Sequence, residues 1–211
     1  MKMLSVYIAD SVKNLVERKL GTNNNGHDIQ HMERVLNNAS KIIADTGANE
    51  KIVYTSIYLH DLIDYKVTDN QEKEIEDIKQ ILGQSNYTNN EIDEIIDIIS
   101  SISFSKHKTL TTINQMIVSD ADKLDALGAI GIIRTIQYGQ SVNRPFYEEA
   151  NLLRSDKNVS FNESTLTSLS HFYDKLLKLP NLMYTNRAKE IAYERVKIIN
   201  DFLESFYNEI K

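Results

Sequence analysis

Apolar residues recur every three or four positions along most of this chain. Near its start Leu4, Ile8, Val12 and Leu15 follow this spacing, and Gly21 ends the predicted helix. No long run alternates between apolar and polar residues, and seven Gly with two Pro supply few turn signals. The pattern therefore predicts an all-α fold.

The same spacing predicts further helices along the rest of the chain. They are expected from residue 27 to Gly47, over 49–64 and 72–82, from 89 and from 113 through 130, then over 163–179 and 186–210. Two pairs, Thr88 with Glu91 and Thr112 with Gln115, resemble capping boxes that open helices. Pro145 is expected in the first turn of a short helix.

Length and composition narrow the class of protein. We expect 211 residues to form a single domain, with a core at about 20–140 and C-terminal helices at about 160–210 packed on it. A formal charge of −6 argues against binding to nucleic-acid polymers, which requires a basic face. No segment approaches the ~20 apolar residues of a membrane span, and the chain contains no cysteine. From the polar residues near its start we expect no signal peptide. We expect a soluble, cytoplasmic protein that is a monomer or a homodimer.

Four residues on predicted helices form a candidate metal site. They are His31, the adjacent pair His60-Asp61, and Asp120 inside an apolar run. Two imidazoles with two carboxylates hold a divalent metal and leave positions open for water and substrate. Taken singly, each residue also fits a packing or salt-bridge role. Their occurrence together favours a metal site between core helices.

Other carboxylates near these four residues are predicted to have roles other than binding the metal. Asp64 shares a helix face with His60 and Asp61, so it is our candidate for orienting or deprotonating the attacking water. The alternative for Asp64 is a helix-end carboxylate bonded to a neighbouring side chain. Asp122 and Asp125 are interpreted as lying on other faces of their helix, as surface or supporting groups.

Several basic residues are placed to reach a phosphate near the metal. Arg34 follows His31 by three positions, Lys123 follows the predicted ligand Asp120 by three, and Lys66 comes just after the His60-Asp61 helix. Guanidinium and ammonium groups bind phosphate oxygens, although salt bridges are the alternative for Arg34 and Lys123. His27, one turn before His31, is expected to bind phosphate or to orient a ligand.

Two further residues, Arg144 and His171, lie outside this constellation. Arg144 is a candidate for the mouth of the cleft, and His171 is interpreted as structural rather than catalytic.

The words "HMERV", "LHD" and "SDADKLDA" resemble the signature of the HD-domain superfamily of metal-dependent phosphohydrolases. Together with "DADKLDALGAIGIIRT" and "HFYDKLLKLPNLMYT", they are similar to the bacterial YpgQ/YedJ group of small HD proteins, over roughly residues 20–210. The resemblance implies that His31, His60, Asp61 and Asp120 are metal ligands. It also implies pyrophosphohydrolase activity on deoxynucleoside triphosphates, supported by manganese.

The leading hypothesis is therefore hydrolysis of a small-molecule nucleotide with one divalent transition metal. Mixed imidazole and carboxylate ligation favours Mn²⁺, with Ni²⁺, Co²⁺, Fe²⁺, Zn²⁺ or Mg²⁺ as alternatives. The same site would also suit a phosphomonoesterase or a cyclic-nucleotide phosphodiesterase. A weakly active nucleotide or metal sensor is the non-enzymatic alternative.

Overall fold

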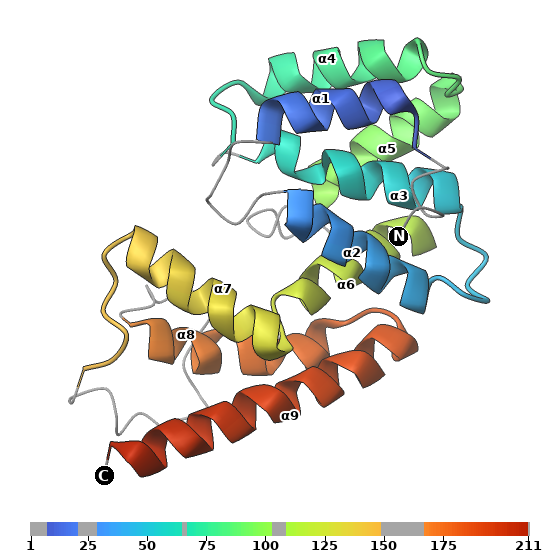
Figure 1. Cartoon of the computed structure of the whole chain (residues 1–211). Helices are drawn as coiled ribbons and strands as arrows, with labels where there is room; N and C mark the ends of the chain where they lie inside the picture. Colours follow the sequence, from blue (N-terminus) through green and yellow to red (C-terminus); the bar gives the residue numbers. More distant parts are fainter. Residues whose placement is uncertain (1–7, 21–28, 65–66, 103–108, 149–166, 211) are drawn as a thin grey trace. The chain divides into compact units, whose positions relative to one another are not determined.

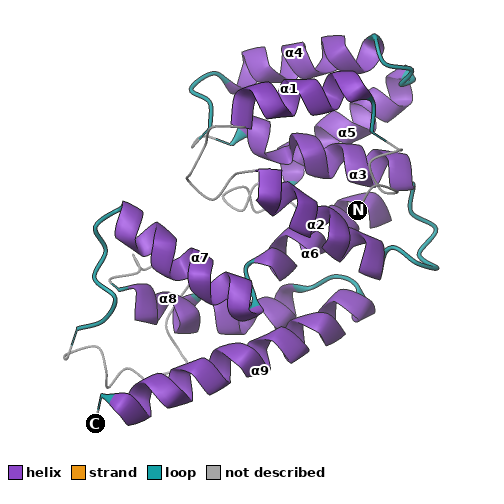
Figure 2. Ribbon diagram, in the orientation of Figure 1, coloured by secondary structure: helices purple, strands orange, loops and turns teal. Residues whose placement is uncertain are grey.

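The computed structural model of the chain describes residues 8–20, 29–64, 67–102, 109–148 and 167–210 (Figure 1). Regular structure within these residues is helical, with no strand among them, which confirms the all-α prediction (Figure 2). None of the described helices combines the length and the apolar character needed to cross a bilayer.

The chain divides into two compact units, residues 1–122 and 123–211, with the boundary inside helix α6. The helices of the first unit and α6 itself are α1 (Asp10–Leu20), α2 (Ile29–Ile42), α3 (Glu50–Leu59), the 3₁₀ helix η2 (His60–Ile63), α4 (Gln71–Gly83), α5 (Asn89–Ser101) and α6 (Ile113–Asp125). Those of the second unit are α7 (Gly128–Ser141), α8 (Ser168–Asp174), the 3₁₀ helix η4 (Leu176–Leu182) and α9 (Asn186–Glu209). The prediction of a single domain stays a prediction.

Helix α3 is the central element of the first unit. It contacts α1, α2 and α5, and nearly all of its residues from Ile52 to Leu59 are buried. A helix with apolar residues on most of its sides is stable only when other helices cover those sides, which explains this position. Its start is fixed by Asn49, whose side chain accepts a hydrogen bond from the Ile52 N–H at 3.2 Å. This central helix leads directly into η2, which begins at His60.

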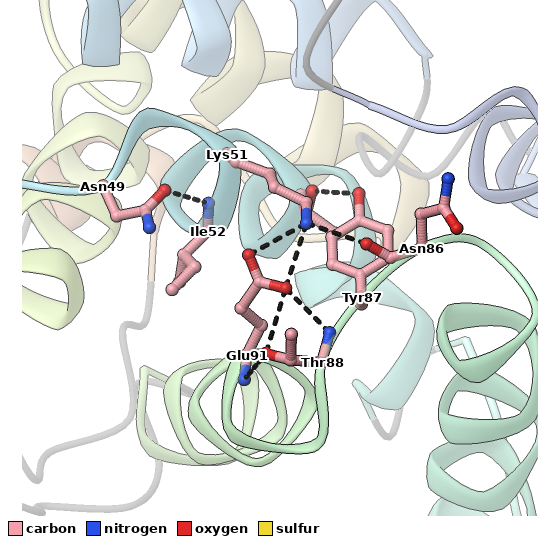
Figure 3. A network of polar contacts seen from close by, with 8 residues as sticks. Asn49, Lys51, Ile52, Asn86, Tyr87, Thr88 and Glu91 are labelled. Carbon is pink, nitrogen blue, oxygen red and sulfur yellow. Dashed lines mark hydrogen bonds and ion pairs between the residues drawn. The ribbon is translucent and has the colours of Figure 1, made fainter.

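A polar network joins the start of α3 to the start of α5 (Figure 3). The Lys51 ammonium donates to both carboxylate oxygens of Glu91, at 2.8 and 3.0 Å, and lies 4.2 Å from the centre of the Tyr87 ring. Glu91 also accepts from the Thr88 N–H at 2.8 Å while Thr88 Oγ1 accepts from the Glu91 N–H at 3.3 Å. The predicted capping box at Thr88 is therefore confirmed, and a cross-helix ion pair reinforces it.

In the second unit α9 contacts both α7 and η4, and α8 contacts the same two elements. Phe172 of α8 is fully buried, and its ring centre lies 5.9 Å from that of Phe202 of α9. The predicted last helix is confirmed, beginning at Asn186 after the N-cap Thr185. These contacts give the second unit its own apolar core.

Two predicted helices are interrupted. The helix expected from 113 through 130 ends at Asp125, because Gly128 has a φ of +70°, a left-handed conformation that strongly favours glycine. Arg195 of α9 caps this end by donating to the Leu124 carbonyl at 2.5 Å. The helix expected over 163–179 begins at Ser168 and gives way to η4, while residues 163–166 lie outside the described part.

Two helix starts also differ from prediction. Pro145 lies in a non-helical connection, so its assignment to a helix was wrong. Helix α1 begins at Asp10, with Ile8 outside it, and Leu4 lies outside the described residues.

Candidate metal centre

Two histidines of the first unit place their Nε2 atoms close together. His31 lies on α2 and is 1% exposed, and His60 is the first residue of η2. Their ring centres are 5.6 Å apart. The Nδ1 atom of His60 lies 2.7 Å from the carbonyl oxygen of Ile57. Because a carbonyl only accepts, Nδ1 carries the proton, and Nε2 keeps the lone pair that a metal requires.

Two carboxylates flank both Nε2 atoms. Asp61 places one oxygen 3.6 Å from Nε2 of His31 and the other 3.2 Å from Nε2 of His60. Asp122 places a single oxygen 3.4 Å from Nε2 of His31 and 3.9 Å from Nε2 of His60. One ligand atom each from His31, His60 and Asp122 lie within 4.8 Å of one another. The arrangement brings nitrogen and carboxylate donors of three segments to one point.

The short 3₁₀ helix η2 fixes the His60-Asp61 pair. Asp64 closes it, because its N–H donates to the Asp61 carbonyl at 3.1 Å. The side chain of Gln71, in the first turn of α4, donates to the Ile63 carbonyl at 2.6 Å. The backbone that carries two candidate ligands is therefore held from both sides.

A buried amide joins α2 to α6. Asn38 lies seven residues after His31, two turns along the same face of α2. Its Nδ2 donates to the carbonyl of Ala121, the residue before Asp122, at 3.1 Å. Asn38 therefore ties the helix of one candidate ligand to the backbone beside another. Asn38 was not among the predicted site residues, although an amide on the apolar face of a helix indicates a buried hydrogen bond of this kind.

The interpretation of Asp122 as a residue facing away from the site was wrong. Its carboxylate lies beside both imidazoles, and its side chain is 41% exposed. Asp120, the predicted fourth ligand, is fully buried and does not belong to the group of three found among the described residues. Asp122 is therefore an additional candidate ligand on α6. The assignment of Asp120 as a ligand stays a prediction.

The other predicted site residues are placed as follows. Arg34 is half-buried on α2, one turn after His31, and the Asp64 side chain is also half-buried. Lys123 donates to the Leu182 carbonyl at 3.1 Å, and its ammonium lies 4.6 Å from the centre of the Tyr184 ring. His27 and Lys66 lie outside the described residues. Their roles, and those of Arg34, Lys123 and Asp64, stay predictions.

The donor set fits a divalent transition metal. Two neutral imidazole nitrogens and two carboxylates balance a 2+ charge, and together they offer fewer protein ligands than an octahedral ion accepts. The partial exposure of Asp122 leaves one side of the cluster accessible to solvent. Such a site can hold an ion and still admit a small ligand.

Comparison with known proteins identifies the family to which this chain belongs. The model of the HD domain matches residues 28–127, which include both histidines and both flanking carboxylates. The Bacillus subtilis protein YpgQ, whose name calls it uncharacterized, is 29% identical over 206 residues, covering 96% of this chain and 93% of its own.

Solved structures agree over almost the whole chain. A Bacillus thuringiensis protein described as an HD-superfamily hydrolase is 32% identical with a TM-score of 0.74, covering 95% of this chain and 94% of its own. Bacillus subtilis YpgQ in complex with ADP is 28% identical with a TM-score of 0.76, covering 95% of this chain and 97% of its own. The chain therefore belongs to the HD superfamily of hydrolases.

Proposed function

We propose that this protein is a metal-dependent nucleotide pyrophosphohydrolase. It would cleave a nucleoside triphosphate between the α and β phosphates, with deoxynucleotides preferred, and release a monophosphate and pyrophosphate. The observation that carries the proposal is the placement of His31, His60, Asp61 and Asp122 around one point. The ADP that is bound to Bacillus subtilis YpgQ supports a nucleotide as the ligand.

Asp122 takes the place of Asp120 in the proposed ligand set. His31, His60, Asp61 and Asp122 would hold one divalent ion, with Mn²⁺ as the first candidate. When bound, such an ion polarises a phosphoryl oxygen and lowers the pKa of water.

The protein's own groups prepare the reaction around that ion. The bond from His60 Nδ1 to Ile57 fixes the orientation of the imidazole, and burial of Asp61 keeps its carboxylate in place. Asp64 would accept the proton of the attacking water. The new bond forms at the α-phosphorus, and pyrophosphate leaves with the electrons of the broken bond.

Cationic side chains would hold the phosphates of the substrate. Arg34, one turn from His31, has the planar group that binds two phosphate oxygens at once. His27, Lys66 and Lys123 are the further candidates from the sequence.

The test is hydrolysis of the eight common ribo- and deoxyribonucleoside triphosphates with added Mn²⁺, with products separated by anion exchange. His60→Ala and a chelator should each abolish turnover, whereas Asp93→Asn, an exposed carboxylate of the same unit, should leave it unchanged. Monophosphate with pyrophosphate is the expected product pair. Orthophosphate would instead indicate a phosphomonoesterase, and no turnover by metal-loaded protein would refute the proposal.

A further inference from the structure

The candidate ligand Asp122 lies in the last turn of its helix. It comes three residues before Asp125, at which α6 ends. The last four carbonyls of an α-helix, here those of residues 122–125, have no partner four residues further on within the helix, and such ends open readily. The position of the Asp122 carboxylate beside His31 and His60 therefore depends on what holds this turn.

Asp125 forms a buried ion pair with Arg134 of α7. Arg134 Nη1 donates to a carboxylate oxygen of Asp125 at 2.5 Å, and Asp125 is 2% exposed. Burial of a carboxylate is strongly unfavourable without a compensating charge, so loss of this partner would be costly. The ion pair joins the last residue of α6 to the helix that follows it.

Arg195 of α9 supports the same turn through its backbone. Its guanidinium donates to the carbonyl of Leu124, which is one of the four carbonyls at the end of α6. The side chain also packs against Gly128, where an added Cβ would lie 3.3 Å from Arg195 Cγ. Burial lowers the pKa of the Arg195 guanidinium, and the negative charge of Asp125 opposes that shift. The Asp125 carboxylate therefore compensates the charge of this second arginine.

We propose that Asp125, Arg134 and Arg195 are positioning residues of the metal centre. They hold the last turn of α6 in its helical conformation and so keep the Asp122 carboxylate beside the two imidazoles. When this turn opens, the carboxylate moves away and the ion loses a ligand. The inference rests on the proposed role of Asp122 as a ligand, and it assigns the three residues an effect on metal binding that passes through Asp122.

The first test is calorimetric titration of the full-length protein with Mn²⁺ in the absence of nucleotide. Arg195→Met removes the charge and the hydrogen bond, and Arg134→Gln removes the ion pair. We expect each change to weaken Mn²⁺ binding about tenfold, because a hydrogen bond that involves a charged group is lost. Arg134→Lys retains the cation and should restore most of the affinity. Arg187→Gln, at an exposed arginine of α9 paired with Glu190, should leave the affinity unchanged.

A double-variant cycle separates positioning from a general loss of stability. In protein that already carries Asp122→Asn, Arg195→Met should not weaken Mn²⁺ binding further, because its effect passes through the carboxylate that has been removed. Glu91→Gln, which weakens the capping box of α5, should leave Mn²⁺ affinity unchanged.

Amide hydrogen exchange reports on the turn itself. The N–H groups of Ala126 and Leu127 donate to the carbonyls of Lys123 and Leu124 at 3.1 and 3.2 Å. These two amides should exchange faster in Arg195→Met than in the wild-type protein, because opening of the turn breaks both bonds.

The outcomes distinguish this inference from the proposed function. Failure of Mn²⁺ to bind the wild-type protein would refute both. Undiminished Mn²⁺ binding by Arg195→Met and Arg134→Gln, when Asp122→Asn has lost the metal, would overturn this inference alone. An equal loss caused by Arg195→Met with and without the Asp122 carboxylate would also overturn it. Failure of nucleotide hydrolysis by Mn²⁺-loaded protein would refute the proposed function and leave these results unchanged.

Discussion

Replacing Asp122 by Asn tests the proposed ligand set most directly. The change keeps the shape of the side chain and removes one negative charge from a group 3.4 Å from His31 Nε2 and 3.9 Å from His60 Nε2. A 2+ ion and a carboxylate oxygen about 2.1 Å apart attract each other by about 4 kcal/mol even at the dielectric constant of water. That energy corresponds to almost three decades in affinity. An amide oxygen retains some coordination, so we expect Mn²⁺ affinity to fall by about 10²-fold to 10³-fold.

Asp120→Asn is the matched control, since the same change is made two residues away on the same helix. Asp120 is fully buried, and its side of α6 is not the side that Asp122 presents to the imidazoles. We expect Mn²⁺ affinity to stay within about threefold, because no ligand charge is lost. Thermal stability should fall instead, because a buried carboxylate depends on its hydrogen bonds.

Calorimetric titration with Mn²⁺, melting curves of the metal-free proteins and turnover of a deoxynucleoside triphosphate complete the comparison. We expect Asp122→Asn to lose metal binding and turnover together, without loss of stability in the metal-free protein. If Asp120→Asn lost the metal while Asp122→Asn retained it, the assignment of Asp122 would be refuted and the original sequence prediction restored.

Three further predictions concern groups around the site and the fold. Asn38→Ala removes the amide that donates to the buried Ala121 carbonyl, so the free energy of unfolding in urea should fall by about 1–3 kcal/mol and the affinity for Mn²⁺ should also fall. Unchanged Mn²⁺ affinity would count against a positioning role for Asn38. Glu91→Gln should cost about 1 kcal/mol at pH 7. Hydrogen bonds from Lys51 and Thr88 lower the pKa of Glu91 below 4.5, so this cost should shrink as acid protonates the carboxylate, and a constant cost in urea melts at pH 7 and 3 would contradict the ion pair. Because burial lowers the pKa of His171 to about 4, the unfolded chain binds a proton at this residue before the folded protein does as the pH falls from 6.5 to 4. The free energy of unfolding should therefore drop by about 3 kcal/mol across that range, and His171→Asn should remove this drop. An equal drop in both proteins would exclude His171 as its cause.

Helix positions were largely predictable from the sequence, because the 3.6-residue period and the end signals are local. The Thr88–Glu91 box and the start of the last helix at Asn186 follow from residues within one turn. The break before Gly128 was missed because apolar spacing continues across it. Only the backbone conformation, with its capping contact from Arg195, shows that one helix has become two.

Spacing along the sequence does not show which carboxylate of α6, Asp120 or Asp122, faces the imidazoles. Asp120 was the predicted ligand because it lies inside an apolar run, but apolar surroundings are typical of the packed side of a helix. Asp122 has Ser119 one turn before it and Ala126 one turn after it. Small neighbours leave room beside a carboxylate for an ion and its remaining ligands. A site that admits substrate is expected at the edge of the core, and this criterion favours Asp122 as the candidate ligand.

The remaining geometry of the centre arises from contacts between segments far apart in the sequence. The adjacent pair His60-Asp61 is visible in the sequence, but its orientation depends on a 3₁₀ turn that Gln71 of the next helix holds in place. The approach of α6 to α2 includes the bond from Asn38 to a backbone carbonyl, which no sequence spacing specifies. The candidate ligands can thus be recognised from their residue types. Their positions, in contrast, depend on the amide side chains of Asn38 and Gln71, which donate hydrogen bonds to backbone carbonyls. Substitution of those amides should therefore disturb metal binding without removing a single ligand.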